Sequence, residues 1–172
     1  MNKILIQNKN DLYFEKAWQI YLEAFPKKER RTLKEQEKLL EKSNYKMLCY
    51  VKEDILIAIV WYWDIDSYTF LEHFAVSNKL RGQAFGSKIL NEFIKNNENI
   101  ILEIEPIVDV VTQKRLEFYE KFGFVINKHE HFQVPFRKNA PEIKLLFMTQ
   151  NTIMPKNDYE KLYERMKSIL ND

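Results

Sequence analysis

Hydrophobic positions along the chain alternate between two spacings, which predict strands and helices in a mixed order. Alternating or continuous apolar runs predict seven strands, over residues 4–7, 45–52, 55–65, 69–76, 100–105, 124–127 and 143–149. Apolar residues three and four apart predict helices over 12–25, 32–42, 86–96, 109–122 and about 158–170. The strand–helix–strand segment from 69 to 105 favours parallel pairing of its two strands. The pattern therefore predicts an α+β fold with a mixed sheet.

Composition narrows the class of protein. A chain of 172 residues favours one domain, and 14% aromatic residues with a net charge of +2 disfavour disorder. The longest apolar run, Ile55–Trp63, is far shorter than the roughly 20 residues of a membrane span, and the N-terminus shows no signal-peptide core. The lone Cys49 excludes an internal disulfide. We therefore expect a cytoplasmic protein with no membrane segment.

Charge and glycine usage point to one local site. Lysine and arginine total 27 against 25 acidic residues, which argues against a broad nucleic-acid surface. The chain has only three glycines, at 82, 86 and 123, where average usage would give about twelve. Two of them lie in the turn between the strand at 69–76 and the helix at 86–96. Small residues and Arg81 at a helix N-terminus favour a phosphate or pyrophosphate site.

The spacing of this turn excludes two common phosphate-binding motifs. Gly82 and Gly86 are one residue too close for a P-loop, and Ser87-Lys88 stand in the wrong order. A dinucleotide-binding turn needs three closely spaced glycines, which are absent. A turn whose glycines serve packing alone is the structural alternative.

Two motifs together carry a family resemblance. Arg81-Gly82-Gln83-Ala84-Phe85-Gly86 resembles the Q/R-x-x-G-x-G/A signature of the GNAT superfamily of acyl-CoA N-acyltransferases, and Phe74-Ala75-Val76-Ser77 is similar to the strand that precedes it. Leu116–Phe124 resembles the family's F-Y-x-K-x-G-F segment, at the family's spacing. Ala84 stands where the family most often has glycine. A helical φ at this position would tolerate alanine.

The resemblance implies a GNAT fold with six to seven strands, whose core spans about residues 3–150, with a helical extension over 151–172. It implies acetyl-CoA as co-substrate, between the strands that end at Val76 and begin at Ile100, and no metal. The implied cofactor-binding residues are Phe74, Ala75, Val76, Arg81, Gly82, Gln83, Ala84, Phe85, Gly86 and Ser87. Tyr119 matches the family tyrosine that acts as general acid toward the departing thiolate.

Carboxylates inside strands are the candidates for a base and for binding a cationic amine. Glu72 and Glu105 are the first candidates for the base, and a water-mediated base is the alternative. Glu103 and His73 are candidates for substrate binding. Strand alternation places Glu72 on the face opposite His73.

Other features have simpler interpretations. His129-Glu130-His131 is typical of a surface loop rather than a metal site. The run Lys27–Arg31 is typical of a solvated turn, although in this superfamily the loop between the first two helices often borders the acceptor site. Trp61 and Trp63 are expected in the core, or one of them as a wall of the acceptor site. The last helix is expected to pack on the core or to form a dimer contact.

The sequence thus predicts an N-acetyltransferase that transfers an acetyl group from acetyl-CoA to the primary amine of an unidentified acceptor. The rival from another class is a non-catalytic acyl-CoA-binding or protein-interaction module on the same fold. We expect a monomer or a homodimer, with no nucleic-acid partner. A single domain over 1–172 is expected.

Overall fold

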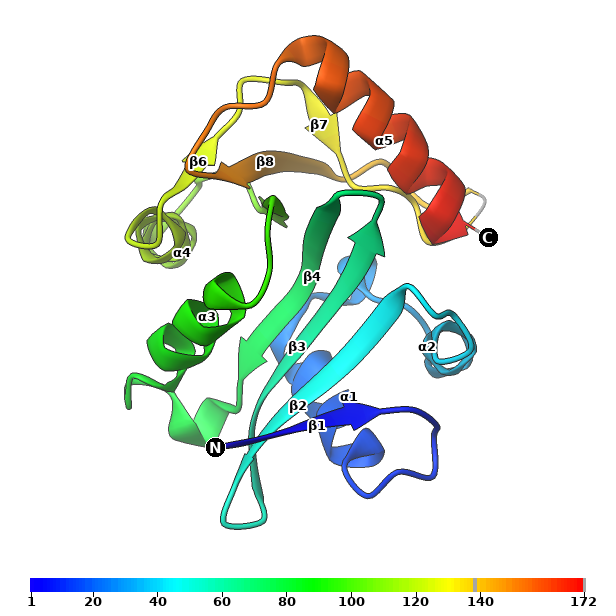
Figure 1. Ribbon diagram of the computed structural model, residues 1–172, viewed down its shortest axis with the longest axis vertical. Helices are drawn as coiled ribbons and strands as arrows, with labels where there is room; N and C mark the ends of the chain where they lie inside the picture. The colour runs from blue at the N-terminus through cyan, green and yellow to red at the C-terminus, as the bar shows by residue number, and fades with distance from the viewer. Residues whose placement is uncertain (138, 172) are drawn as a thin grey trace. The chain divides into compact units, whose positions relative to one another are not determined.

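The computed structural model describes residues 1–137 and 139–171, which form two compact units. The first unit comprises residues 1–64 and 71–98, and the second comprises residues 65–70 and the chain from 99 onward. Figure 1 shows the elements of each unit. Their order is β1 (Asn2–Ile6), α1 (Phe14–Ala24), η1 (Lys27–Glu29), α2 (Leu33–Leu39), β2 (Tyr45–Lys52), β3 (Ile55–Ile65), β4 (Tyr68–Val76), η2 (Asn78–Leu80), α3 (Phe85–Lys95), β5 (Ile100–Ile104), α4 (Val110–Glu120), β6 (Phe124–Ile126), β7 (His131–Phe132), β8 (Lys144–Gln150) and α5 (Lys156–Asn171).

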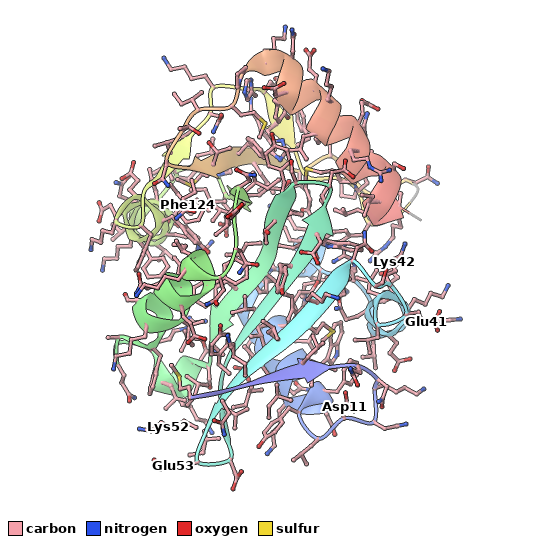
Figure 2. All side chains as sticks on the ribbon, viewed as in Figure 1. Asp11, Glu41, Lys42, Lys52, Glu53 and Phe124 are labelled. Atoms are coloured by element: carbon pink, nitrogen blue, oxygen red, sulfur yellow. The ribbon has the colours of Figure 1, made fainter. Side chains whose placement is uncertain are left out.

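Strands β1 to β4 follow one another in both sequence and space in the first unit. β1 and β3 pair antiparallel with β2, on opposite edges. The two-residue turn between β2 and β3 is made by Glu53 and Asp54, both with positive φ, and Glu53 marks its tip in Figure 2. Positive φ at both positions gives a turn whose twist matches that of the flanking strands. The predicted hairpin is therefore confirmed.

Strand β3 is buried on both faces, which explains its continuous apolar run. The Trp61 ring packs 4.9 Å from that of Tyr21 on α1. The neighbouring Tyr62 contacts Phe93 of α3 with its ring, at 5.2 Å. Because successive side chains point to opposite faces, α1 and α3 cover the two faces of this strand. Trp61 and Trp63 are both fully buried, so the predicted core placement is confirmed.

Strand β8 is the centre of the second unit. It pairs antiparallel with β5 along one edge and with β6 and β7 along the other. β6 and β8 confirm the two predicted closing strands. β7 was not expected, because two residues are too few to show a periodic pattern. An α+β architecture is confirmed, whereas a single domain over the whole chain stays a prediction.

Helix α5 packs its apolar stripe inside the second unit. Tyr159, Leu162, Met166 and Leu170 are buried at helical spacing. Tyr159 also contacts Phe147 of β8, with ring centroids 5.2 Å apart. The expectation that this helix packs on a core is therefore confirmed. Among residues 1–137 and 139–171, no helix is both long enough and apolar enough to cross a membrane.

Candidate active site

The turn between β4 and α3, residues 77–84, lies in the first unit and has the geometry of an anion cradle. Gly82 has φ +79° and open space around the position of a Cβ atom. α3 begins at Phe85, and no side chain caps its N-terminus. The first backbone N–H groups of a helix have no partner within the helix, and the helix dipole adds positive potential there. These residues fit a phosphate or pyrophosphate group.

Ala84 corrects an expectation from the sequence. Its φ is +60° and its ψ is 11°, which is left-handed rather than helical. An alanine in this conformation costs about 1–2 kcal/mol because its Cβ atom approaches the following carbonyl. The turn therefore needs a positive φ at this position, and small size is not the whole requirement.

Arg81 is exposed and lies beside the end of β4. Its Nε donates a hydrogen bond to the Val76 carbonyl oxygen at 3.3 Å. This contact keeps the guanidinium next to the turn, where its remaining donors suit a phosphate. The other predicted strand residues of the cofactor site, Phe74, Ala75 and Val76, form the end of β4, with Ala75 buried.

Tyr119 lies on α4 in the second unit, half-buried between two phenylalanine rings. Its ring centroid is 5.3 Å from that of Phe118 and 5.7 Å from that of Phe124, which Figure 2 labels at the start of β6. Burial raises the pKa of Tyr119 to about 12, Arg115 opposes this shift, and Glu105 adds to it. The phenol therefore keeps its proton at neutral pH and can donate it in a hydrogen bond.

Glu105 forms an ion pair with Arg115 of α4. Partial burial favours a higher pKa for this carboxyl, but the hydrogen bond and charge of Arg115 outweigh it, so the pKa of Glu105 is lowered. A carboxylate held in this way has less tendency to take up a proton. The ion pair therefore weighs against Glu105 as the general base.

Glu72 forms a bidentate ion pair with Arg31 inside the first unit. Both oxygens lie 2.7 Å from guanidinium nitrogens, and the two side chains are only 3% and 4% exposed. Burial alone would raise the pKa of Glu72, but Arg31 and His73 lower it well below its ordinary value. Glu72 is therefore held as a carboxylate, which weighs against a role in accepting the proton of an ammonium.

Arg31 and His73 both differ from the sequence-based expectation. Arg31 is buried, so the solvated turn predicted over Lys27–Arg31 is wrong at this residue. His73 was expected on the face opposite Glu72, yet its Nδ1 lies 3.3 Å from the Glu72 carboxylate. The His73 ring packs edge-on against the Tyr21 and Phe25 rings, each at 4.7 Å. The structure thus brings Arg31, Glu72 and His73 together in one buried polar cluster.

Glu103 of β5 contacts His131, a residue that was expected in a surface loop. His131 is buried in β7, and its Nε2 lies 2.6 Å from Glu103 Oε1. The surface-loop prediction is therefore wrong for His131. The signal available in the sequence was that His131 directly precedes Phe132, Val134 and Phe136, which alternate with Gln133 and Pro135. Among the described residues, no group of three or more His, Cys, Asp or Glu side chains could hold a metal ion.

Comparisons with known proteins agree with this architecture. The family model of the acetyltransferase (GNAT) domain matches residues 43–126. YjbC of Bacillus subtilis (strain 168), which is named for an inferred acetyltransferase activity, is 35% identical over 105 residues. The match covers 59% of this chain and 53% of YjbC, so the chain matches about half the length of that relative.

Solved structures extend the likeness over the whole chain. An inferred GNAT-family acetyltransferase from Bacteroides thetaiotaomicron superposes with a TM-score of 0.89 at 22% identity, covering 100% of this chain and 99% of that one. A GNAT-family acetyltransferase from Elizabethkingia anophelis, solved with acetyl-CoA bound, has a TM-score of 0.59 at 15% identity, covering 88% and 97%. The chain therefore has the GNAT fold, and its residues 43–126 match the family model of the GNAT acetyltransferase domain.

Proposed function

We propose that this protein is an acetyl-CoA-dependent N-acetyltransferase that acts on a primary amine. The observation that carries the proposal is the uncapped N-terminus of α3, preceded by Gly82 and Ala84 with positive φ. This arrangement supplies backbone N–H donors for a pyrophosphate. The relative from Elizabethkingia anophelis, which has the same fold, was solved with acetyl-CoA bound.

Residues 81–87 and the end of β4 would hold the co-substrate. Bound acetyl-CoA supplies an activated acyl group as a thioester. The chain's own contribution at the loop is orientation: Arg81 and the first turn of α3 bind the phosphates. Phe74, Ala75 and Val76 are proposed as the strand residues beside the pantetheine.

Tyr119 is proposed as the hydrogen-bond donor to the departing thiolate. With its pKa raised to about 12, the phenol is protonated at neutral pH. A typical thiol has a pKa near 8.5, well below that of this phenol, so complete proton transfer from the phenol to the thiolate would be unfavourable. A hydrogen bond to the developing negative charge is therefore the role that the phenol can perform.

The acceptor's ammonium must lose a proton before its nitrogen attacks. Glu72 and Glu105 are both bound to arginines, and both have lowered pKa values. We therefore favour the alternative from the sequence analysis, a water that carries the proton away. Glu72 and Glu105 would then contribute fixed negative charge and hold Arg31 and Arg115 in place.

The direct test is thiol release from acetyl-CoA in the presence of an amine panel. Spermidine, kanamycin and a lysine-containing peptide represent a polyamine, an aminosugar and a protein side chain. We expect amine-dependent release with at least one of them, together with acetylated product by mass spectrometry. Acetyl-CoA binding without transfer to any amine would instead support the non-catalytic acyl-CoA-binding module.

A further inference from the structure

The three carboxylates Glu72, Glu103 and Glu105 differ in how their charge is balanced. Glu72 is paired with Arg31 and Glu105 with Arg115. Within residues 1–137 and 139–171, neither a lysine nor an arginine pairs with Glu103, and its hydrogen-bonding partner is His131. Among these three, Glu103 is therefore the carboxylate whose negative charge is not cancelled by an arginine.

His131 is the middle of a hydrogen-bonded chain that lies entirely within the second unit. Its Nε2 lies 2.6 Å from Glu103 Oε1, and its Nδ1 lies 2.7 Å from the Tyr159 hydroxyl. The same hydroxyl lies 3.3 Å from the Glu130 carbonyl oxygen. The shorter contact favours a phenol that donates to Nδ1, which leaves the ring proton on Nε2 to be donated to Glu103. In that arrangement His131 orients the carboxylate through one hydrogen bond from Nε2.

Contacts made by helix α5 and its neighbours hold the Tyr159 ring in place. Tyr159 stacks on Tyr163, whose hydroxyl donates to the Phe132 carbonyl oxygen at 2.9 Å. On the other side, the His129 ring stacks on Tyr159 at 4.3 Å, with its Nε2 2.8 Å from the Met154 carbonyl oxygen. These contacts fix the Tyr159 ring and give α5, which lies outside the family-model match, a defined connection to Glu103.

The exposed fractions of the His131 and Glu103 side chains show which of the two can contact a ligand. The His131 side chain is fully buried and both of its ring nitrogens are occupied, whereas the Glu103 side chain is 10% exposed. His131 contacts the Oε1 atom of Glu103, and among residues 1–137 and 139–171 no hydrogen bond to its Oε2 is recorded, so that oxygen can accept from a ligand. A primary ammonium, with three N–H donors and a positive charge, fits such a carboxylate.

We propose that Glu103 binds the ammonium of the acceptor, and that His131 and Tyr159 are positioning residues that hold its carboxylate. The inference rests on the proposed function and narrows it, since the acceptor would be recognised as a primary alkylammonium ion. It also assigns a role to the C-terminal helix: α5 orients a binding residue on β5 through Tyr159.

The kinetic test uses spermidine, or whichever amine of the panel is acetylated, and three variants. Glu103→Gln should raise KM for the amine by about tenfold, because one favourable charge interaction is lost. Tyr159→Phe should raise it by about threefold or more, because His131 loses its donor. Lys161→Met, a matched control at an exposed position of the same helix, should stay within about twofold, and the affinity for acetyl-CoA should be unchanged in all three. An unchanged KM for the amine in Glu103→Gln overturns the proposal.

An NMR measurement on the His131 ring does not depend on acetyl transfer. It therefore tests the ammonium site at Glu103 separately from the proposed acetyltransferase activity. Long-range proton–nitrogen NMR should show His131 with its proton on Nε2 in the wild type, and a changed tautomer balance in Tyr159→Phe but not in Lys161→Met. Added spermidine should shift the His131 signals in the wild type and not in Glu103→Gln. If no amine is acetylated but these shifts occur, the proposed function fails and the ammonium site stands. If spermidine causes no shift in the wild type, the site is refuted.

Discussion

Arg31 and Glu72, 41 residues apart in the sequence, form a buried bidentate ion pair with both contacts at 2.7 Å. The pair connects the loop before α2 to β4. The Arg31 backbone N–H also donates to the Tyr21 hydroxyl at 2.8 Å, so this loop is attached to α1 as well. Arg31 is therefore a structural centre of the first unit.

Removing one partner of this pair should be costly. Arg31→Met leaves the Glu72 charge buried and unpaired, which we expect to lower the free energy of unfolding by about 3–5 kcal/mol. Replacing both residues, with Arg31→Met and Glu72→Leu, should recover much of that loss because no isolated charge remains. Urea unfolding measures both changes. Lys27→Met, an exposed change in the same loop, should stay within about 0.5 kcal/mol; equal losses in the control and in Arg31→Met would contradict the account.

The same pair predicts a pH dependence with a definite sign. The pKa of Glu72 is lowered in the folded protein relative to its ordinary value of 4.5. Its contribution to stability is therefore fully present above pH 4.5 and is lost as the pH falls below that value. The difference in unfolding free energy between wild type and Glu72→Gln should be constant from pH 6 to 8 and shrink toward pH 3. A difference that grows on acidification would show that the pKa is raised instead.

Ala84 provides a test of the turn geometry. Ala84→Gly removes the steric cost of a left-handed alanine. Glycine also makes the unfolded chain more flexible, which offsets part of this gain, so we expect the free energy of unfolding to rise by about 0.5–1 kcal/mol. Ala84→Val should destabilise the protein instead, because a branched side chain is a poor fit to φ +60°. Thermal unfolding of the three proteins ranks them directly. Valine more stable than glycine at this position would exclude the left-handed turn.

Tyr119 should affect turnover and leave cofactor affinity unchanged. Tyr119→Phe removes the proposed donor to the thiolate, and we expect kcat to fall about 10²-fold with acetyl-CoA affinity within about twofold. Because the pKa of Tyr119 is raised to about 12, its ionisation should produce no loss of activity up to about pH 10. Single-turnover kinetics isolate the chemical step. Tyr62→Phe, on a strand of the other unit, is the control, and equal rates in wild type and Tyr119→Phe would remove the proposed role.

The sequence predicted features that depend on local chemistry. The strand–turn–helix around Gly82 follows from residue types within a few positions, and the glycine at 123 follows from the end of a helix, where the structure has φ +82°. Both positions need a backbone conformation that glycine adopts most easily.

Features that depend on distant partners were not predictable. Arg31 lies in a run of charged residues that resembles any solvated loop, and only Glu72, brought near by the fold, explains its burial. His131 is likewise buried because Glu103 and Tyr159 satisfy both ring nitrogens, and each is 28 residues away in the sequence. The φ of Ala84 is set by the turn as a whole, and alanine itself favours the helical value.

Cofactor binding is tested most directly by a calorimetric titration of the purified protein with acetyl-CoA, with desulfo-CoA and ATP as comparators. Gly86→Glu, which places a negative charge in the first turn of α3, is the matched variant. We expect saturable acetyl-CoA binding that is tighter than ATP binding and is abolished in Gly86→Glu. Absence of binding in the wild type, or undiminished binding in the variant, would contradict the assignment of this turn to coenzyme A.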